Sequence, residues 1–288
     1  MKKLLRIGNS FLRLLFSNRP KVYWWSYIDE NGIVKQNFGD YLNTYLVEKI
    51  TGKKPILFFP NSKLSFFIKH SIMIGSVINK SSATTYVWGS GIIKKNEKIK
   101  GGKFLAVRGP RTAKRLEELG YKAPKVYGDP AILSPLIYQN TESAKYEIGI
   151  IPHFFNYKTI NEFDYDKEQI LVIDLLSDDV EFVLSQMLSC KKIISTSLHG
   201  LILAHAYQIP AVWWKYSELN GDDVKFYDYL ESVNIKIKTD YKGLGFDEII
   251  QIDSYYLPDF DIITRMQKKL LSVFPYKKLQ FFNDFVKN

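Results

Sequence analysis

The chain has 288 residues, 46% of them hydrophobic, so it can bury a large core as one big domain or two of ordinary size. Its single cysteine, Cys190, excludes a disulfide network and a cysteine-rich metal site, and the four histidines lack zinc-ligand spacing, so we predict no structural metal. The formal net charge of +10 favours anionic partners, and nucleic acid is the least favoured because no zinc-knuckle, RNP-like or helix-turn-helix signature is present.

Residues 1–18 are predicted to form a basic amphipathic helix, with leucine, isoleucine and phenylalanine on one face and lysine and arginine on the other. Such a helix can lie on an anionic membrane surface, or it can pack on the protein's own core. Arg13 interrupts the apolar part and no small-residue cleavage site follows, so we predict no export. No apolar run is long enough to span a bilayer. The expected location is the cytoplasm, at the inner face of the membrane if the first alternative holds.

The first predicted strand covers residues 22–28, and a loop containing Asn37, Gly39 and Asp40 follows it. Asp40 is predicted to cap a helix that presents an apolar face and ends at Gly52. Residues 55–59, 71–78 and 84–88 are predicted to be buried strands. The last of these leads into three small residues that allow a backbone to approach a phosphate or a sugar closely, namely Gly89, Ser90 and Gly91.

A further strand over residues 103–107 places Arg108 at its carboxyl end, where parallel sheets bind ligands. We therefore predict that Arg108 binds an anion. Arg111 lies in the first turn of the next helix, where its charge opposes the helix dipole, and we leave a solvated role and an anion-binding role equally open for it. Gly128 and Asp129 then form another junction between a strand and a loop.

The polar stretch 138–145 lacks periodicity and is the predicted boundary between an N-terminal domain, residues 1–140, and a C-terminal domain, residues 141–288. The second half begins with strands over residues 146–151 and 170–174 and a helix over 179–188 capped by Ser177 or Asp178. Strands and helices alternate in both halves, so we predict two doubly wound, Rossmann-like α/β domains facing a cleft.

Residues 191–214 form the clearest unit, a strand, a hydroxyl-rich loop, a helix and a second strand. His199 lies in the first turn of that helix, and its side chain is well placed for acid–base chemistry next to free backbone N–H groups. The neighbouring candidates for substrate binding are Ser195, Thr196, Ser197, Leu198 and Gly200. Trp213 and Trp214 end the second strand, and because neighbouring strand residues face opposite ways, at least one of them is core.

These motifs, taken in order, resemble the polysaccharide pyruvyl transferase family. The resemblance rests on an Asn-x-Gly-Asp before a helix, an Arg-Gly loop, a Gly-Asp-Pro and a Leu-His-Gly before a small-residue helix, and it covers residues 37–214. Lys225 lies in a segment, Lys-Phe-x-Asp-Tyr, that is similar to one in many bacterial members. The chain departs from the family at Ser197, where many members carry an arginine. The family also resembles two-domain, GT-B-like glycosyltransferases in architecture.

The resemblance implies transfer of pyruvate from phosphoenolpyruvate to two hydroxyls of a sugar in an exopolysaccharide, capsule or cell-wall glycan precursor, giving a cyclic ketal. Phosphoenolpyruvate is then a substrate, and no cofactor is expected. His199, with an expected pKa near neutrality, would protonate the methylene carbon. Asp129 and Asp40 would orient or deprotonate the hydroxyls, and Arg108 would bind the donor. The acceptor can be lipid-linked or a finished polymer. Two alternatives remain open, namely a nucleotide-sugar glycosyltransferase and a non-catalytic scaffold of glycan assembly.

Overall fold

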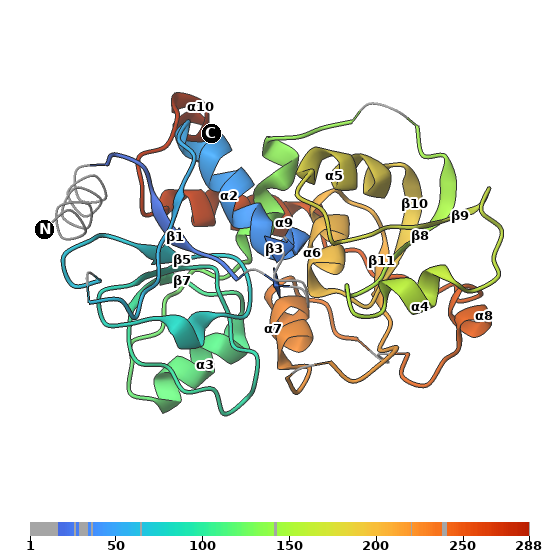
Figure 1. Ribbon diagram of the computed structural model, residues 1–288, viewed down its shortest axis with the longest axis horizontal. Helices are drawn as coiled ribbons and strands as arrows, with labels where there is room; N and C mark the ends of the chain where they lie inside the picture. The colour runs from blue at the N-terminus through green and yellow to red at the C-terminus, as the bar shows by residue number, and fades with distance from the viewer. Residues whose placement is uncertain are drawn as a thin grey trace, which may run out of the picture.

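The computed structural model describes residues 17–288 except residues 26, 29–33, 36, 64, 141–142, 220, 238–240 and 288. Nearly all of the predicted amphipathic helix, residues 1–16, therefore lies outside the described residues. The described part is a mixed α/β structure with two separate parallel sheets that lie next to one another, as Figure 1 shows. The predicted class, α/β with parallel sheets in both halves, is confirmed.

The first sheet has five parallel strands in the order β4-β1-β5-β6-β7. Each predicted strand of this half is present but shorter than expected. Residues 71–78, for example, yield only two strand residues, because Gly75 adopts a φ of +103° and turns the chain away from the sheet. The strands are β1 (Lys21–Tyr23), β4 (Ile56–Leu57), β5 (Ser71–Ile72), β6 (Tyr86–Trp88) and β7 (Lys103–Ala106).

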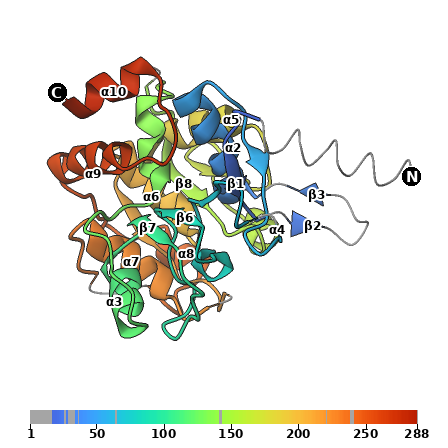
Figure 2. The ribbon, with the colours of Figure 1, turned by 90° about the vertical axis from the view of Figure 1, so that its left-hand side faces the viewer.

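The predicted strand 22–28 divides into two elements. After β1 the chain leaves the sheet, and β2 (Tyr27–Ile28) pairs antiparallel with β3 (Val34–Lys35) instead. Figure 2 shows this pair standing out from the body of the molecule.

The second sheet has four parallel strands in the order β11-β10-β8-β9, and it confirms the central strand–helix–strand unit. Its strands are β8 (Tyr146–Ile151), β9 (Ile170–Val172), β10 (Cys190–Ser195) and β11 (Ala211–Trp213). Helix α6 (Leu198–Ala206) connects β10 to β11. The other helices of this half are α4 (Tyr157–Asn161), α5 (Val180–Leu188), α7 (Val224–Ser232) and α8 (Phe246–Ile249). The N-cap of α5 is Asp179, whose side chain accepts a hydrogen bond from the Phe182 N–H. The predicted caps, Ser177 and Asp178, were therefore wrong.

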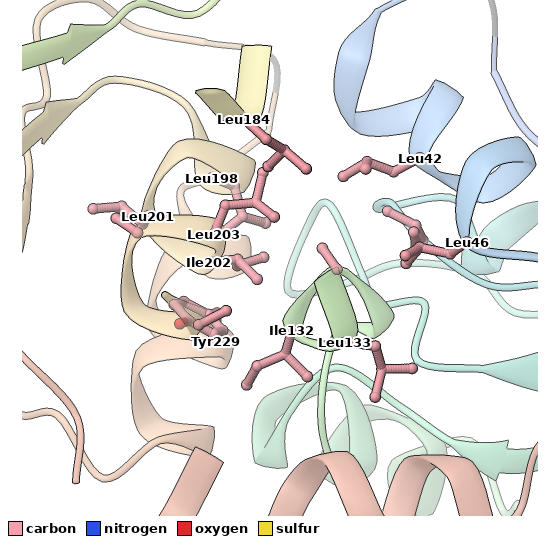
Figure 3. Close-up of a cluster of buried hydrophobic side chains, with 14 of the residues drawn as sticks. Leu42, Leu46, Ile132, Leu133, Leu184, Leu198, Leu201, Ile202, Leu203 and Tyr229 are labelled. Atoms are coloured by element: carbon pink, nitrogen blue, oxygen red, sulfur yellow. The ribbon is translucent and has the colours of Figure 1, made fainter. Parts of the chain in front are cut away.

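One continuous hydrophobic cluster joins the two halves. Helix α2 (Phe38–Thr51) and the 3₁₀ segment η2 (Pro130–Leu136) face α6 across it. Figure 3 shows Leu42 and Leu46 of α2 on one side and Leu198 and Ile202 of α6 on the other. Burial of this many aliphatic side chains in one cluster fixes the two sheets relative to one another.

The end of the chain returns to the first half. The indole Nε1 of Trp88 donates to the Leu270 carbonyl in α9 (Phe260–Ser272) at 2.8 Å, and the Tyr276 hydroxyl donates to the Lys21 carbonyl at 2.6 Å. Helix α10 (Gln280–Lys287) follows, and α3 (Pro110–Glu118) and η1 (Ile78–Lys80) complete the first half. Within the described residues no helix is both long and apolar enough to cross a bilayer.

Candidate functional site

A cavity of about 310 Å³ lies where the carboxyl ends of the two sheets come together. From the first sheet, Trp25 follows β1 and residues 75–77 follow β5. From the second, His153 follows β8 and Leu175 follows β9. Parallel α/β sheets bind ligands at this edge, so the fold itself predicts a binding site here.

Three helices begin at the cavity. Asn37 is the N-cap of α2, with its side-chain oxygen accepting from the Gly39 N–H at 3.3 Å. Asp40 was predicted to be the N-cap, and this prediction is wrong by three positions. The helix already begins at Phe38, so Asp40 lies in its first turn. Ser197 is the N-cap of α6, and Lys225 lies in the first turn of α7. Helix N-termini present free N–H groups and partial positive charge, so this convergence favours an anion.

His199 packs directly on Gly39. A Cβ atom built at position 39 would lie 1.9 Å from Nδ1 of His199, so only glycine leaves room for this ring. Two motifs that are 160 residues apart in the chain therefore form one site.

The other ring nitrogen of His199, Nε2, is buried without a hydrogen-bond partner among the described residues and lies 4.0 Å from Oδ2 of Asp129. That carboxylate oxygen is also buried and without a partner in the described structure. A buried polar atom without a partner costs free energy, so these two atoms are suited to share a proton or to bind a polar group of a ligand.

The pKa values of the site depart from ordinary ones. Burial, reinforced by the charges of Lys225 and Arg108, lowers the pKa of His199 to about 3, so the imidazole is neutral near pH 7 and forms no ion pair with Asp129. This corrects the expectation of a pKa near neutrality. Burial raises the pKa of Asp40 to about 7 and that of Asp129 to about 6, and it lowers that of Lys225 to about 8.

Arg108 lies behind the cavity lining and is fully buried. Its guanidinium donates through Nε to Asp228 at 3.0 Å, through Nη1 to Ser76 Oγ at 2.7 Å and through Nη2 to the Ile92 carbonyl at 2.7 Å. The absence of a side chain at Gly91 makes room for it, because a Cβ there would lie 2.4 Å from Cζ. Direct binding of the donor by Arg108 stays a prediction, and the structure places its charge behind Ser76.

Arg111 lies away from the cavity. It pairs with Glu231 at 2.7 Å and covers the Tyr227 ring, with 4.7 Å from its Cζ to the ring centroid. These contacts account for its position in the first turn of α3 without an anionic ligand.

Several predicted binding residues form a second layer that holds the lining in place. Ser90 Oγ donates to the Gly75 carbonyl at 2.7 Å, and Thr196 Oγ1 accepts from the His153 N–H at 2.6 Å. Ser195 Oγ donates to the Ile151 carbonyl at 2.9 Å. The glycines of this layer allow close packing; they are Gly89 against Pro130, Gly128 against Leu270 and Gly200 against Ser195. The predicted residues that do line the cavity are Asn37, Asp40, Ser197, Leu198, His199 and Lys225.

Besides the single residues Ile93 and Leu175, two parts of the lining were not predicted from the sequence. Gly75, Ser76 and Val77 were placed inside a strand, although the glycine after an apolar run was a usable turn signal. The second part is an aromatic edge formed by Trp25, His153, Phe154 and Phe155. Trp213 and Trp214 are both buried, so neither contributes to that edge.

Comparison with known proteins agrees with this geometry. A family model described as polysaccharide pyruvyl transferase matches residues 6–218, which include every cavity-lining residue except Lys225. An uncharacterised protein of Acanthamoeba polyphaga mimivirus, L143, is 34% identical over 209 residues, covering 69% of this chain and 72% of that protein. The chain therefore belongs to the polysaccharide pyruvyl transferase family.

Proposed function

We propose that this protein transfers pyruvate from phosphoenolpyruvate to two hydroxyls of a sugar in a polysaccharide or its precursor. The observation that carries the proposal is the buried Nε2 of His199, which has no hydrogen-bond partner among the described residues and is set among three helix N-termini and the Lys225 ammonium. A small ligand with a carboxylate and a phosphate needs such a concentration of positive charge and N–H donors.

Many relatives carry an arginine at the position of Ser197. In this chain Lys225 would bind the donor in its place. Its side chain lines the cavity, and Asp40 and Asp223 support its charge. The Ser197 side chain makes no capping hydrogen bond to the first turn of α6, so the backbone N–H groups of that turn are left for a ligand to accept from. The donor would therefore lie between α6 and α7.

Binding of the donor would turn His199 into an acid. Burial lowers the pKa of His199 most, and the positive charges of Lys225 and Arg108 lower it further. A bound anion offsets the part due to these charges, so the pKa of the ring rises from its low value. His199 then protonates the methylene carbon, and Asp129, 4.0 Å behind it, stabilises the imidazolium. Asp40, which lines the cavity, accepts a proton from a sugar hydroxyl.

The reaction balances without a further reactant. One hydroxyl proton ends on the new methyl carbon through His199, and the other leaves with phosphate. Two C–O bonds form at the ketal carbon as its bond to the phosphate oxygen breaks and its double bond to the methylene carbon is lost. No oxidation occurs, so the step needs no redox cofactor. We propose that it also proceeds without a metal, with Lys225 and the helix N-termini supplying the positive charge.

We predict that phosphoenolpyruvate stabilises the protein, by about 2.7 kcal/mol at a hundred times its dissociation constant. Affinity should fall as the pH rises through about 7 and 8, because Asp40 gains a negative charge and Lys225 loses its positive charge. Thermal shift against pH measures this, with Lys225→Met removing the upper step and Lys114→Met, exposed on α3, as the control. Stabilisation by UDP- or GDP-sugars alone would favour a nucleotide-sugar transferase. If neither phosphoenolpyruvate nor a nucleotide sugar stabilises the protein, a non-catalytic scaffold is favoured.

The acceptor sugar would bind along the aromatic edge. The rings of His153 and Phe154 stack with centroids 4.5 Å apart, those of Phe154 and Phe155 lie 4.1 Å apart, and Phe155 is 64% exposed. Aromatic rings with an open face suit the apolar faces of a sugar better than they suit a small dianion.

We expect Phe155→Ala to raise the acceptor KM about ten-fold, which corresponds to ~1.4 kcal/mol, with the KM for phosphoenolpyruvate unchanged. Phosphate release with a panel of oligosaccharides measures both constants, and Phe182→Ala, a similarly exposed phenylalanine on α5, is the matched control. A change in the donor KM alone would place the aromatic edge in the donor site.

Other parts of the proposal concern context. The family implies a polysaccharide sugar acceptor, and we propose that it belongs to an exopolysaccharide, capsule or cell-wall precursor handled in the cytoplasm. A GT-B-like arrangement of two domains, divided within residues 138–145, is part of the same proposal. The shared hydrophobic cluster in Figure 3 is then the contact between the two domains.

A further inference from the structure

The loop between β4 and β5, residues 58–70, exposes three phenylalanines. Phe59 is 59%, Phe66 73% and Phe67 76% exposed, whereas the neighbouring Phe58 and Ile68 are each only 4% exposed. Apolar side chains of this size, gathered in one loop, mark a surface that contacts something other than water.

Hydrogen bonds hold the loop in this shape. The Ser65 N–H donates to the Ser62 carbonyl at 3.0 Å, and the Thr84 hydroxyl donates to the Ser65 carbonyl at 3.0 Å. His70 connects the Ile68 carbonyl, at 2.7 Å, to the Thr85 hydroxyl, at 2.8 Å. Because both ends of the phenylalanine pair are fixed, Phe66 and Phe67 are presented outward by the fold.

The charged residues in the sequence around this loop are all basic. Residues 49–96 contain eight lysines and no aspartate or glutamate. Lys63 and Lys69 flank the phenylalanine pair and are exposed. The loop lies at the left-hand edge of Figure 1, in blue-green. Exposed aromatic residues bordered by lysine are complementary to a surface with an apolar interior and anionic headgroups.

The described chain begins close to this edge. Arg19 donates through Nε to the Lys54 carbonyl at 2.7 Å and through Nη2 to the Pro55 carbonyl at 3.1 Å, just before β4. The segment 1–18, predicted from its sequence to form a basic amphipathic helix, therefore ends beside strand β4, from which the phenylalanine loop continues.

We propose that the loop 58–70 docks this protein on an anionic lipid bilayer, with Phe66 and Phe67 inserted among the headgroups and Lys63 and Lys69 paired with them. A second copy of the chain fits this surface less well, because a symmetric contact would bring like charges together. The surface is separate from the cavity, so the inference does not depend on the proposed reaction.

Flotation of the full-length protein with phosphatidylcholine vesicles, with and without phosphatidylserine, tests the proposal. The wild type should float with the anionic vesicles, and the double variant Phe66→Ser/Phe67→Ser should lose about ten-fold in partitioning. The matched control, Phe182→Ser/Phe260→Ser, removes two phenylalanines that are 55% and 62% exposed on α5 and α9 and should float like the wild type. Melting temperatures of both variants verify folding.

Equal flotation of wild type and Phe66→Ser/Phe67→Ser would overturn the proposal and leave residues 1–16 or the lysines as the contact. Failure of the wild type to float would overturn it as well. If sedimentation instead shows a dimer that the double variant converts to monomer, the loop is an interface between copies and the bilayer assignment is wrong.

Discussion

Replacing His199 by asparagine should lower kcat by at least about 100-fold while phosphoenolpyruvate still stabilises the protein. General acid catalysis by one side chain is worth about 10²- to 10⁴-fold, and the proposed reaction cannot begin before the methylene carbon is protonated. The helix N-termini and Lys225 remain in the variant, so donor binding should survive. Single-turnover phosphate release measures the chemical step, and thermal shift measures binding.

The variant should also fold normally. Nε2 of His199 makes no hydrogen bond to a described residue, so removing it leaves no donor or acceptor of the described structure without its partner. Retention of more than about a tenth of the wild-type kcat would show that another group protonates the donor. Asp40 would then be the candidate, because burial raises its pKa to about 7 and keeps part of the population protonated near neutrality.

A second variant, Gly39→Ala, should displace the His199 ring without changing His199 itself. In Gly39→Ala the new Cβ would lie 1.9 Å from Nδ1 of His199, so the imidazole must move while every acid–base group stays in the chain. The loss in kcat should approach that of His199→Asn. Gly245→Ala is the control, because a Cβ there meets no atom of the described residues nearer than 3.5 Å and the backbone φ is an ordinary −72°. Normal activity in Gly39→Ala would mean that the ring position is not critical.

The contact between Gly39 and His199 shows what the sequence could and could not predict. Periodicity and turn residues located α2 and the β10-α6-β11 unit, because these depend on local patterns of apolar residues. That Gly39 is a packing partner of His199 depends on how the two halves meet through the cluster around Leu42 and Ile202, and no local pattern encodes that. The family resemblance placed both residues in the site without giving this reason.

For Arg108 the sequence predicted the position of the residue but not its contacts. Its place at the end of β7 was predictable, since the strand pattern and the following Gly-Pro are local. Its three hydrogen-bond acceptors come from residues up to 120 positions away, so a buried structural pair and an exposed anion-binding site look the same in the sequence. Likewise, the aromatic edge at Phe154 and Phe155 depends on β8 ending beside β10, which is a property of sheet order.

Removing the buried carboxylate at Asp228 should cost far more stability than removing an exposed one on the same helix. Asp228 accepts from Arg108 Nε at 3.0 Å, from the Thr112 N–H at 2.9 Å and from the Thr112 hydroxyl at 2.7 Å, and both members of the ion pair are completely buried. Asp228→Ala leaves a guanidinium without its counter-charge in the protein interior. The expected loss in the free energy of unfolding is about 3–5 kcal/mol.

Glu231→Ala provides the comparison, because Glu231 also lies on α7 and also pairs with an arginine, Arg111 of α3. In this pair both side chains are more than a third exposed, Glu231 at 41% and Arg111 at 34%. Solvent screens that pair, so its loss should cost at most about 1 kcal/mol. Urea unfolding of the two variants gives both values under identical conditions. Asp228→Ala should also weaken donor binding, because Lys225 lies one turn before it and the Asp228 contacts hold α7 against β7 and α3. Equal costs for the two variants would mean that the Arg108–Asp228 pair does not fix α7, and the position of Lys225 would then need another cause.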